Sequence, residues 1–273
     1  MSELGVDNVA VLGAGKMGNT LIHALRRSGL AAGKIVATGR REAPLARLAE
    51  NEGVATSRDN REAVAGADLV LLCVKPQVVA GVLDEIGAVM NDKQVLVSIA
   101  AGATTRLIES HLPGEVPVVR AMPNTPSLIG AGMTALCGGR WASDAQVETA
   151  RRVFAGMGRT MVLDEDYFDA VTGLSASGPA FVYIIIEALA EGGVKAGLPR
   201  SVATELAAQA CLGASRMVLD TEAHPALLKD DVTTPAGCTM DGILKLEEGG
   251  LRVTLIKAVV EATRRAGELV GPD

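Results

Sequence analysis

Aromatic residues are scarce in this chain. Phe, Tyr and Trp make up 2% of its 273 residues, whereas hydrophobic residues as a whole make up 48%. Proteins that bind single-stranded nucleic acid stack the bases on aromatic side chains, so the composition argues against that class. The core must be built from Ala, Val, Leu and Ile, a mixture that suits Rossmann-type sheets and closely packed helices.

Positive charge and long apolar runs are lacking as well. The formal net charge is -6, which argues against broad affinity for phosphate backbones or anionic membranes. Residues 1–8 lack the basic start and apolar run of a signal peptide. The most apolar stretches, Leu69–Val74 and Phe181–Ile186, are too short to span a bilayer. These absences predict a cytoplasmic protein with no nucleic-acid and no membrane partner.

The cysteines and histidines form no recognisable cluster. The three histidines are scattered, and none of the four cysteines belongs to a CxxC pair. Zinc sites and disulfide frameworks need such spacing. We therefore expect no metal ion, and reduced thiols at Cys73, Cys137, Cys211 and Cys238.

The first part of the chain, residues 1–163, alternates short β-branched runs with helical segments. The runs are apolar on both faces, which is typical of a parallel sheet covered by helices on both sides. We predict a Rossmann-type, doubly wound, mostly parallel sheet. Its expected strands are Asn8–Leu12, Lys34–Thr38, Leu69–Val74, Gln94–Ile99, Val116–Arg120, Gly132–Cys137 and Arg159–Leu163. Its expected helices are Met17–Ser28, Ala43–Glu52, Val78–Met90, Thr104–His111 and Asp144–Met157.

The remainder, residues 164–273, has helical spacing and no convincing strand. Proline stands where several helices would begin, and glycine where they would end. The sequence thus predicts an all-α C-terminal domain, with its boundary after residue 163. The expected helices are Asp169–Leu174, Pro179–Ala196, Pro199–Asp220, Met240–Glu248 and Arg252–Val270.

One of these helices is apolar on every face. Residues 181–186 read FVYIII, and a helix of that kind must be buried all round. It is either the central helix of one subunit or part of an intertwined dimer. A small helical domain can hardly bury it alone, so we favour a homodimer.

A glycine-rich turn follows the first predicted strand. GxGxxG between a strand and a helix is typical of a dinucleotide site, although a purely structural turn is the alternative. Gly13 would allow the tight turn, Gly15 would admit the pyrophosphate, and Gly18 would let helix and strand pack closely. The helix start then presents free N–H groups to the anion. The residues expected to bind the cofactor here are Gly13, Ala14, Gly15, Lys16, Met17 and Gly18.

The end of the second strand selects the cofactor. Enzymes that use NAD usually place Asp or Glu there to bind the ribose 2′-hydroxyl. This chain has Thr38, Arg40 and Arg41 instead, and guanidinium groups bind a 2′-phosphate with paired charge-assisted hydrogen bonds. The alternative is that both arginines are solvated loop charges. We predict NADPH, with NADH less favoured.

Later strand ends complete the predicted pocket, because ligands of such sheets lie beyond the carboxyl ends of the strands. Lys75 precedes a proline at one strand end, although an ordinary surface lysine is the alternative. Small residues at the next strand end would let the backbone approach the nicotinamide. The further cofactor candidates are Asn60, Val74, Lys75, Pro76, Ala100 and Ala101.

A threonine-rich loop, residues 230–242, stands out in the helical part. It contains three threonines and runs into a helix expected to start near Thr239. Exposed N–H groups at that helix start, together with the threonine hydroxyl groups, would form a binding site for a carboxylate. The alternative is simple N-capping by Thr239 or Thr234.

Taken in order, these segments resemble pyrroline-5-carboxylate reductases. The resemblance extends from about Val9 to Leu269, and it is most specific in two segments, RAMPNTP at 120–126 and TPAGCT at 234–239. It implies reduction of 1-pyrroline-5-carboxylate to L-proline by NADPH. It also implies a homodimer joined through the C-terminal helices, in some members assembled further to a decamer.

The resemblance assigns roles to single residues. Thr239 matches the threonine that hydrogen-bonds the substrate ring nitrogen, and is the catalytic candidate. The implied substrate-binding residues are Glu165, Thr234, Gly237, Cys238 and Thr239, with the backbone at 237 and 238 holding the carboxylate. Asn124 lies in the segment beside the nicotinamide. Ala236 departs from the family, which has glycine there, so the turn is expected to differ.

Three other interpretations compete. A β-hydroxyacid dehydrogenase would carry a catalytic lysine on the helix after the second glycine-rich segment, where this chain has only apolar residues from Pro179 to Tyr183. A related cyclic imine reductase with another ring size fits the same sequence. A non-catalytic NADPH-binding regulator should lack the threonine loop, which is present.

Overall fold

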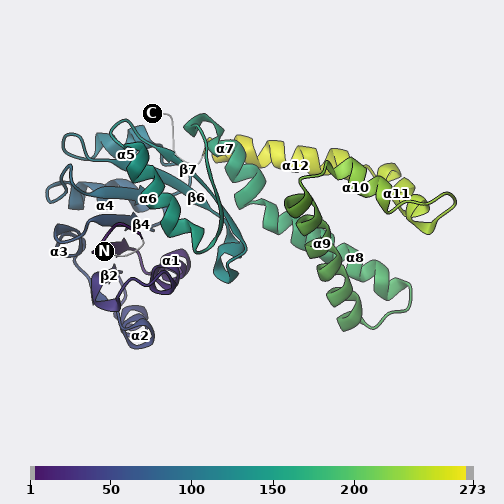
Figure 1. Ribbon diagram of the computed structural model, residues 1–273, viewed down its shortest axis with the longest axis horizontal. Helices are drawn as coiled ribbons and strands as arrows, with labels where there is room; N and C mark the ends of the chain where they lie inside the picture. Colours follow the sequence, from purple (N-terminus) through teal and green to yellow (C-terminus); the bar gives the residue numbers. More distant parts are fainter. Residues whose placement is uncertain (1–3, 269–273) are drawn as a thin grey trace. The chain divides into compact units, whose positions relative to one another are not determined.

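The structure is a computed structural model that describes residues 4–268. The chain divides into two compact units (Figure 1). One contains the described residues up to Ala176 and those from Glu261 onward, and the other is Ser177–Val260.

The first unit is built on one sheet with the strand order β3-β2-β1-β4-β5-β6-β7-β8. Neighbouring strands are parallel except for β6 and β7, which are antiparallel. This is the predicted doubly wound, mostly parallel sheet. The strands are β1 (Val9–Leu12), β2 (Ile35–Thr38), β3 (Ala55–Ser57), β4 (Leu69–Leu72), β5 (Val95–Ser98), β6 (Val118–Pro123), β7 (Gly132–Gly138) and β8 (Gly158–Val162).

Helices cover both faces of this sheet because successive strand side chains point to opposite sides. In β1, Val9 and Val11 belong to one core cluster, whereas Ala10 and Leu12 belong to the other. The first cluster packs against α1 and α6, and the second against α3, α4 and α5. The helices are α1 (Lys16–Arg27), α2 (Glu42–Glu52), α3 (Asn60–Ala65), α4 (Val79–Gly87), α5 (Thr105–Ser110) and α6 (Asp144–Ala155).

The sequence missed two short elements of this unit. Strand β3 has three residues, and α3 has six. Neither is long enough to show a hydrophobic period. Asp59 caps α3 by accepting hydrogen bonds from the backbone N–H groups of Arg61 and Glu62.

The first unit extends past the boundary expected at residue 163. Phe168 is completely buried in a small cluster with Met122, Ala135 and Cys137 of β6 and β7. This packing ties α7 (Phe168–Val171) and the π-helical turn η5 (Thr172–Ala176) to the sheet. By packing, the division therefore falls at Ala176, whereas the change of sequence period falls earlier.

The second unit is helical, as predicted. Helices α8 and α9 lie side by side as a hairpin, with Ala203 close to Gly193 (Figure 1). Helix α10 has seven residues and begins at Pro225, a proline that marks a helix start in the sequence, although its extent was not predicted. The helices are α8 (Gly178–Lys195), α9 (Arg200–Thr221), α10 (Pro225–Asp231), α11 (Cys238–Glu248) and α12 (Leu251–Ala266), of which α12 ends in the first unit.

Apolar side chains of α8 are exposed in the single chain. Tyr183 is 62% and Ile184 64% accessible, although the sequence requires this helix to be buried. The helical run Glu165–Lys195 is also long and apolar enough to cross a membrane by length and composition alone. An 18-residue window within it has a mean hydropathy of 1.5 and is 11% buried. This corrects the expectation that every apolar stretch is too short.

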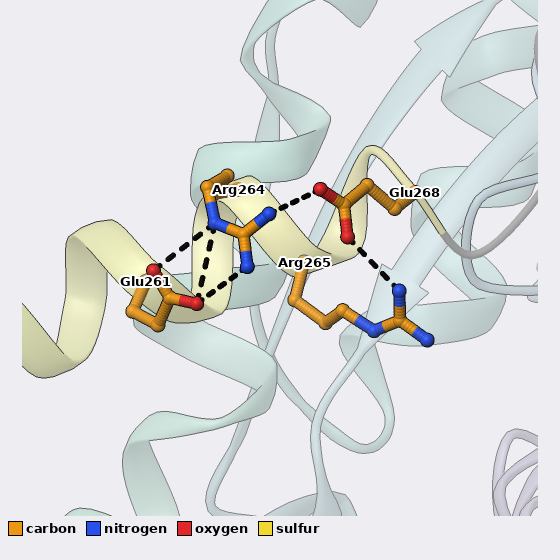
Figure 2. Close-up of polar contacts among 4 residues, drawn as sticks. All are labelled: Glu261, Arg264, Arg265 and Glu268. Carbon is orange, nitrogen blue, oxygen red and sulfur yellow. Dashed lines mark hydrogen bonds and ion pairs between the residues drawn. The ribbon is translucent and has the colours of Figure 1, made fainter.

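The last turn of α12 carries a surface network of ion pairs (Figure 2). Arg264 binds Glu261 and Glu268, and Arg265 binds Glu268. The hydrogen bond from Arg264 lowers the pKa of the Glu261 carboxyl below its usual value. Two cations at a helix C-terminus also interact favourably with the helix dipole.

Candidate cofactor and substrate sites

The glycine turn after β1 has the tight turn at Gly13 and the close packing at Gly18 that the sequence predicted. Gly13 has a φ of +104°, and a Cβ there would lie 2.7 Å from the carbonyl oxygen of Cys73. A Cβ at Gly18 would lie 2.2 Å from the carbonyl oxygen of Gly13, so the helix packs directly on the turn. A Cβ at Gly15 would meet nothing within 4 Å, which leaves that face of the turn open.

The backbone N–H groups of the turn divide into two sets. Those of Gly13 and Ala14 donate to the carbonyl oxygen of Thr38, at 3.1 and 2.8 Å, so they hold the turn against β2. The first-turn N–H groups of α1, from Lys16 to Gly18, are those that a helix leaves without an internal acceptor. Helix α1 has no acidic residue in its first turn and no side-chain cap. Its N-terminus can therefore bind an anion.

A cavity of about 780 Å³ opens beside this turn within the first unit. The sequence missed three polar residues in its lining, Arg58, Gln77 and Glu85. Arg58 follows the short strand β3, which the sequence did not predict, and the other two follow β4. The predicted cofactor residues that line the cavity are Gly13, Ala14, Gly15, Thr38, Arg40, Arg41, Asn60, Val74 and Lys75.

A chain of hydrogen bonds crosses the wall of the cavity. The hydroxyl of Thr38 donates to Oδ1 of Asn60 at 2.6 Å, and Nδ2 of Asn60 donates to Oε2 of Glu85 at 2.9 Å. Thr38 is 1% accessible, and its proton is engaged within the protein. Thr38 therefore orients the Asn60 side chain in the wall of the cavity.

Other predicted cofactor residues lie outside this lining. Lys16, Met17 and Gly18 form the start of α1. Ala100 is 2% accessible in the core, and Ala101 packs beside Met122 and Phe168. Within the described residues the cavity lining also does not include Pro76 or Asn124.

Asn124 uses its amide inside the first unit. Its Oδ1 accepts from the backbone N–H of Met133 at 2.9 Å, and its Nδ2 donates to the carbonyl oxygen of Ser175 at 3.2 Å. Ser175 belongs to the π-helical turn η5, a geometry that is frequent at functional sites. Asn124 thus joins the segment after β6 to that turn.

Glu165, a predicted substrate residue, is bound to a buried arginine. Its carboxylate accepts from Nη1 of Arg120 at 2.9 Å, and from the backbone and hydroxyl of Thr105 at 2.8 and 2.5 Å. The side chain of Arg120 is 3% accessible and lies 4.7 Å from the centre of the Phe168 ring. In the first unit, Glu165 therefore acts as the counter-ion of Arg120.

The threonine loop lies in the second unit, and α11 begins at Cys238, one residue before the start expected near Thr239. The N-cap of α11 is Gly237, and the helix has no side-chain cap, so neither Thr234 nor Thr239 has the capping role. The N–H of Gly237 donates to the carbonyl oxygen of Thr234 at 2.9 Å. The first-turn N–H groups of Cys238 and Thr239 remain for a carboxylate, one residue later than predicted.

Ala236 adopts an unusual backbone conformation in the threonine loop. It has a φ of +57°, a backbone region that glycine adopts without cost and alanine does not. A Cβ at Gly237 would lie 2.4 Å from Oγ1 of Thr234. The turn is therefore close-packed, with backbone strain at Ala236.

The four cysteines are unpaired, and two of them are shielded. Burial raises the pKa of the Cys73 thiol to about 12, and it does the same for Cys137, where Glu165 adds to the effect. Both thiols are therefore protonated at neutral pH. Among the described residues, no three His, Cys, Asp or Glu side chains are grouped so as to hold a metal ion.

Two family models match the chain. Residues 165–269 match the model described as pyrroline-5-carboxylate reductase dimerisation. Residues 8–102 match the model described as NADP oxidoreductase coenzyme F420-dependent. The start of the first match lies close to the change of period in the sequence.

Full-length relatives and solved structures agree with these matches. A pyrroline-5-carboxylate reductase of Glycine max is 41% identical over 94% of this chain and 94% of that protein. Human pyrroline-5-carboxylate reductase 2 is 40% identical over 96% of this chain and 83% of that protein. The structure of a pyrroline-5-carboxylate reductase from Coxiella burnetii matches with a TM-score of 0.91 and 36% identity, over 97% of this chain and 99% of that one.

A further structure carries a cofactor. Pyrroline carboxylate reductase of Plasmodium falciparum, with NADP bound, matches with a TM-score of 0.86 and 27% identity, over 98% of each chain. The identities, the coverage and the dimerisation match together show that the chain belongs to the pyrroline-5-carboxylate reductase family.

Proposed function

We propose that this protein reduces 1-pyrroline-5-carboxylate to L-proline with NADPH. Membership of the family supports the reaction, and full-length relatives at about 40% identity carry that name. The choice of NADPH as the cofactor rests on one observation, the uncapped start of α1 beside a cavity lined by Arg40 and Arg41. NADH is the less favoured cofactor.

The cavity fits a dinucleotide phosphate. The open face at Gly15 admits the pyrophosphate, and the N–H groups of the first turn of α1 can bind it. Arg40 and Arg41 follow β2, where an enzyme specific for NAD would carry an acid. When bound, NADPH supplies the hydride that reduces the imine carbon.

The protein's own part in the chemistry is to hold and orient the substrate. A protonated imine is already electrophilic, so alignment can account for much of the rate enhancement. In the threonine loop, the N–H groups of Cys238 and Thr239 at the start of α11 bind the substrate carboxylate in this proposal. The Thr239 hydroxyl hydrogen-bonds the ring nitrogen. It is too weak an acid to act alone, so it orients the ring and supports proton delivery.

The second unit joins two copies of the chain. The exposed apolar side chains of α8 lie within the dimerisation match, so we infer that a second copy covers them in a homodimer. A partner subunit also accounts for the exposed apolar run Glu165–Lys195 without a membrane. Further assembly to a decamer and a cytoplasmic location are part of the same proposal.

A substrate comparison tests the reaction. NADPH oxidation should be rapid with 1-pyrroline-5-carboxylate and at least about tenfold slower with the six-membered imine acid, since a misplaced reacting atom loses rate steeply. Equal or faster reduction of the larger ring would assign the protein to the related cyclic imine reductases. No oxidation of NADPH with either imine would favour a non-catalytic role.

A further inference from the structure

We propose that Arg58 is a specificity-determining residue, which binds the 2′-phosphate of the cofactor together with Arg40 and Arg41. The proposal rests on the use of NADPH proposed above. It adds a third guanidinium from a strand that the sequence did not reveal.

The sheet register brings these arginines to one edge. Strands β2 and β3 are parallel, and Thr38 is paired with Ser57 at their carboxyl ends. The chain then continues into Arg40 on one side and Arg58 on the other. All three arginines line the same cavity.

These side chains contrast with other arginines of the chain. Arg151 and Arg264 are paired with glutamates on their own helices. Among the described residues, Arg40, Arg41 and Arg58 have no ion-pair partner. Three arginines that line one cavity without an ion-pair partner favour an anionic ligand, and a phosphate suits the hydrogen-bonding geometry of guanidinium groups.

The neighbouring acidic side chains are engaged elsewhere. Asp59 caps α3 through its Oδ1. Glu62 accepts from the hydroxyl of Ser57 at 3.1 Å, and Glu85 accepts from Asn60. The arginine end of the cavity therefore stays positive, whereas an acid directed there would favour the free ribose hydroxyl of NADH.

Binding measurements without substrate test the proposal. Dissociation constants for NADPH, NADH and adenosine 2′,5′-bisphosphate are measured by calorimetry on the intact oligomer. Arg58→Ala should weaken NADPH and the bisphosphate about tenfold and change NADH less than about twofold, because one charge-assisted contact to phosphate is lost. Arg58→Lys should lie between, since lysine keeps the charge and loses the paired geometry.

Arg47→Ala is the matched control. Arg47 is an exposed arginine of α2 outside the cavity lining, so its removal changes the net charge equally. It should leave all three constants within about twofold, since exposed charges at a distance are screened by salt. An equal loss for NADPH and NADH in Arg58→Ala, or a loss no larger than in Arg47→Ala, would overturn the proposal. Failure to reduce the imine would leave these constants untouched and would refute the proposed reaction alone.

Discussion

The two compact units bury their apolar side chains to very different degrees. In the first, the central strands β1, β4 and β5 are buried at every position, and helices cover both faces of the sheet. In the second, the residues of α8 and α9 that are buried within a single chain are Ala190, Ala203 and Ala207. The first unit therefore buries a large core in one chain, whereas the second buries only a small alanine cluster and exposes the apolar side chains that we propose a second copy covers.

The largest expected effect tests the dependence of the second unit on a partner. Ile184 is 64% accessible in α8, and Ile184→Asp would place an unpaired charge in an apolar interface. We expect the dimer to weaken by about 3 kcal/mol or more, roughly 100-fold, with monomer visible by light scattering at micromolar concentration.

The matched control for that prediction lies in the first unit. Ile129 is 82% accessible, and Ile129→Asp makes the same chemical change outside the proposed interface. It should leave the oligomeric mass unchanged. If both variants dissociate, or neither does, the contrast between the units is wrong.

The next effect tests whether the first unit is stabilised from within. Arg120→Ala removes the buried ion-pair partner of the Glu165 carboxylate, together with the packing of the guanidinium on the Phe168 ring. Breaking a buried ion pair of this kind costs about 3 kcal/mol of the free energy of unfolding. Urea denaturation should show the loss at every protein concentration, because no subunit contact is involved.

Arg151→Ala provides the comparison for Arg120. Arg151 pairs with Glu148 on the surface of α6, where solvent screens the interaction. It should change the urea midpoint far less than Arg120→Ala does. Equal urea midpoints for the two variants would show that the buried ion pair stabilises the protein no more than the surface pair does.

The smallest effect concerns the strained turn of the second unit. Ala236→Gly removes a Cβ from a residue at a φ of +57°, which should stabilise the protein by about 0.5 kcal/mol. Ala46→Gly, at an exposed position inside α2, should destabilise it by up to about 1 kcal/mol. Thermal unfolding distinguishes the two signs. Destabilisation by both changes would mean that Ala236 is not strained.

The sequence predicted what depends on spacing and period. The glycine turn, the parallel strands and the long helices follow from residues close together in the chain, and the structure confirms them. The partners of Thr38 and Glu165 lie 22 and 45 residues away, so their hydrogen bonds needed the fold. Arg58 was missed because the strand before it has only three residues.

The threonine loop shows a second limit. Sequence alone cannot say which residue of a capping segment becomes the N-cap, because the choice depends on backbone angles. Here the positive φ of Ala236 and the hydrogen bond from Gly237 to Thr234 make Gly237 the N-cap. That shift of one residue decides which N–H groups are free.

The role of Thr239 tests the account most directly. In Thr239→Ala, kcat should fall about 30-fold, which corresponds to the loss of about 2 kcal/mol of hydrogen bonding in the transition state. The dissociation constant for NADPH should stay within about twofold, and Thr239→Ser should restore most of the turnover, because the hydroxyl returns. An unchanged kcat in Thr239→Ala, or a matching loss of NADPH affinity, would contradict the proposed mechanism.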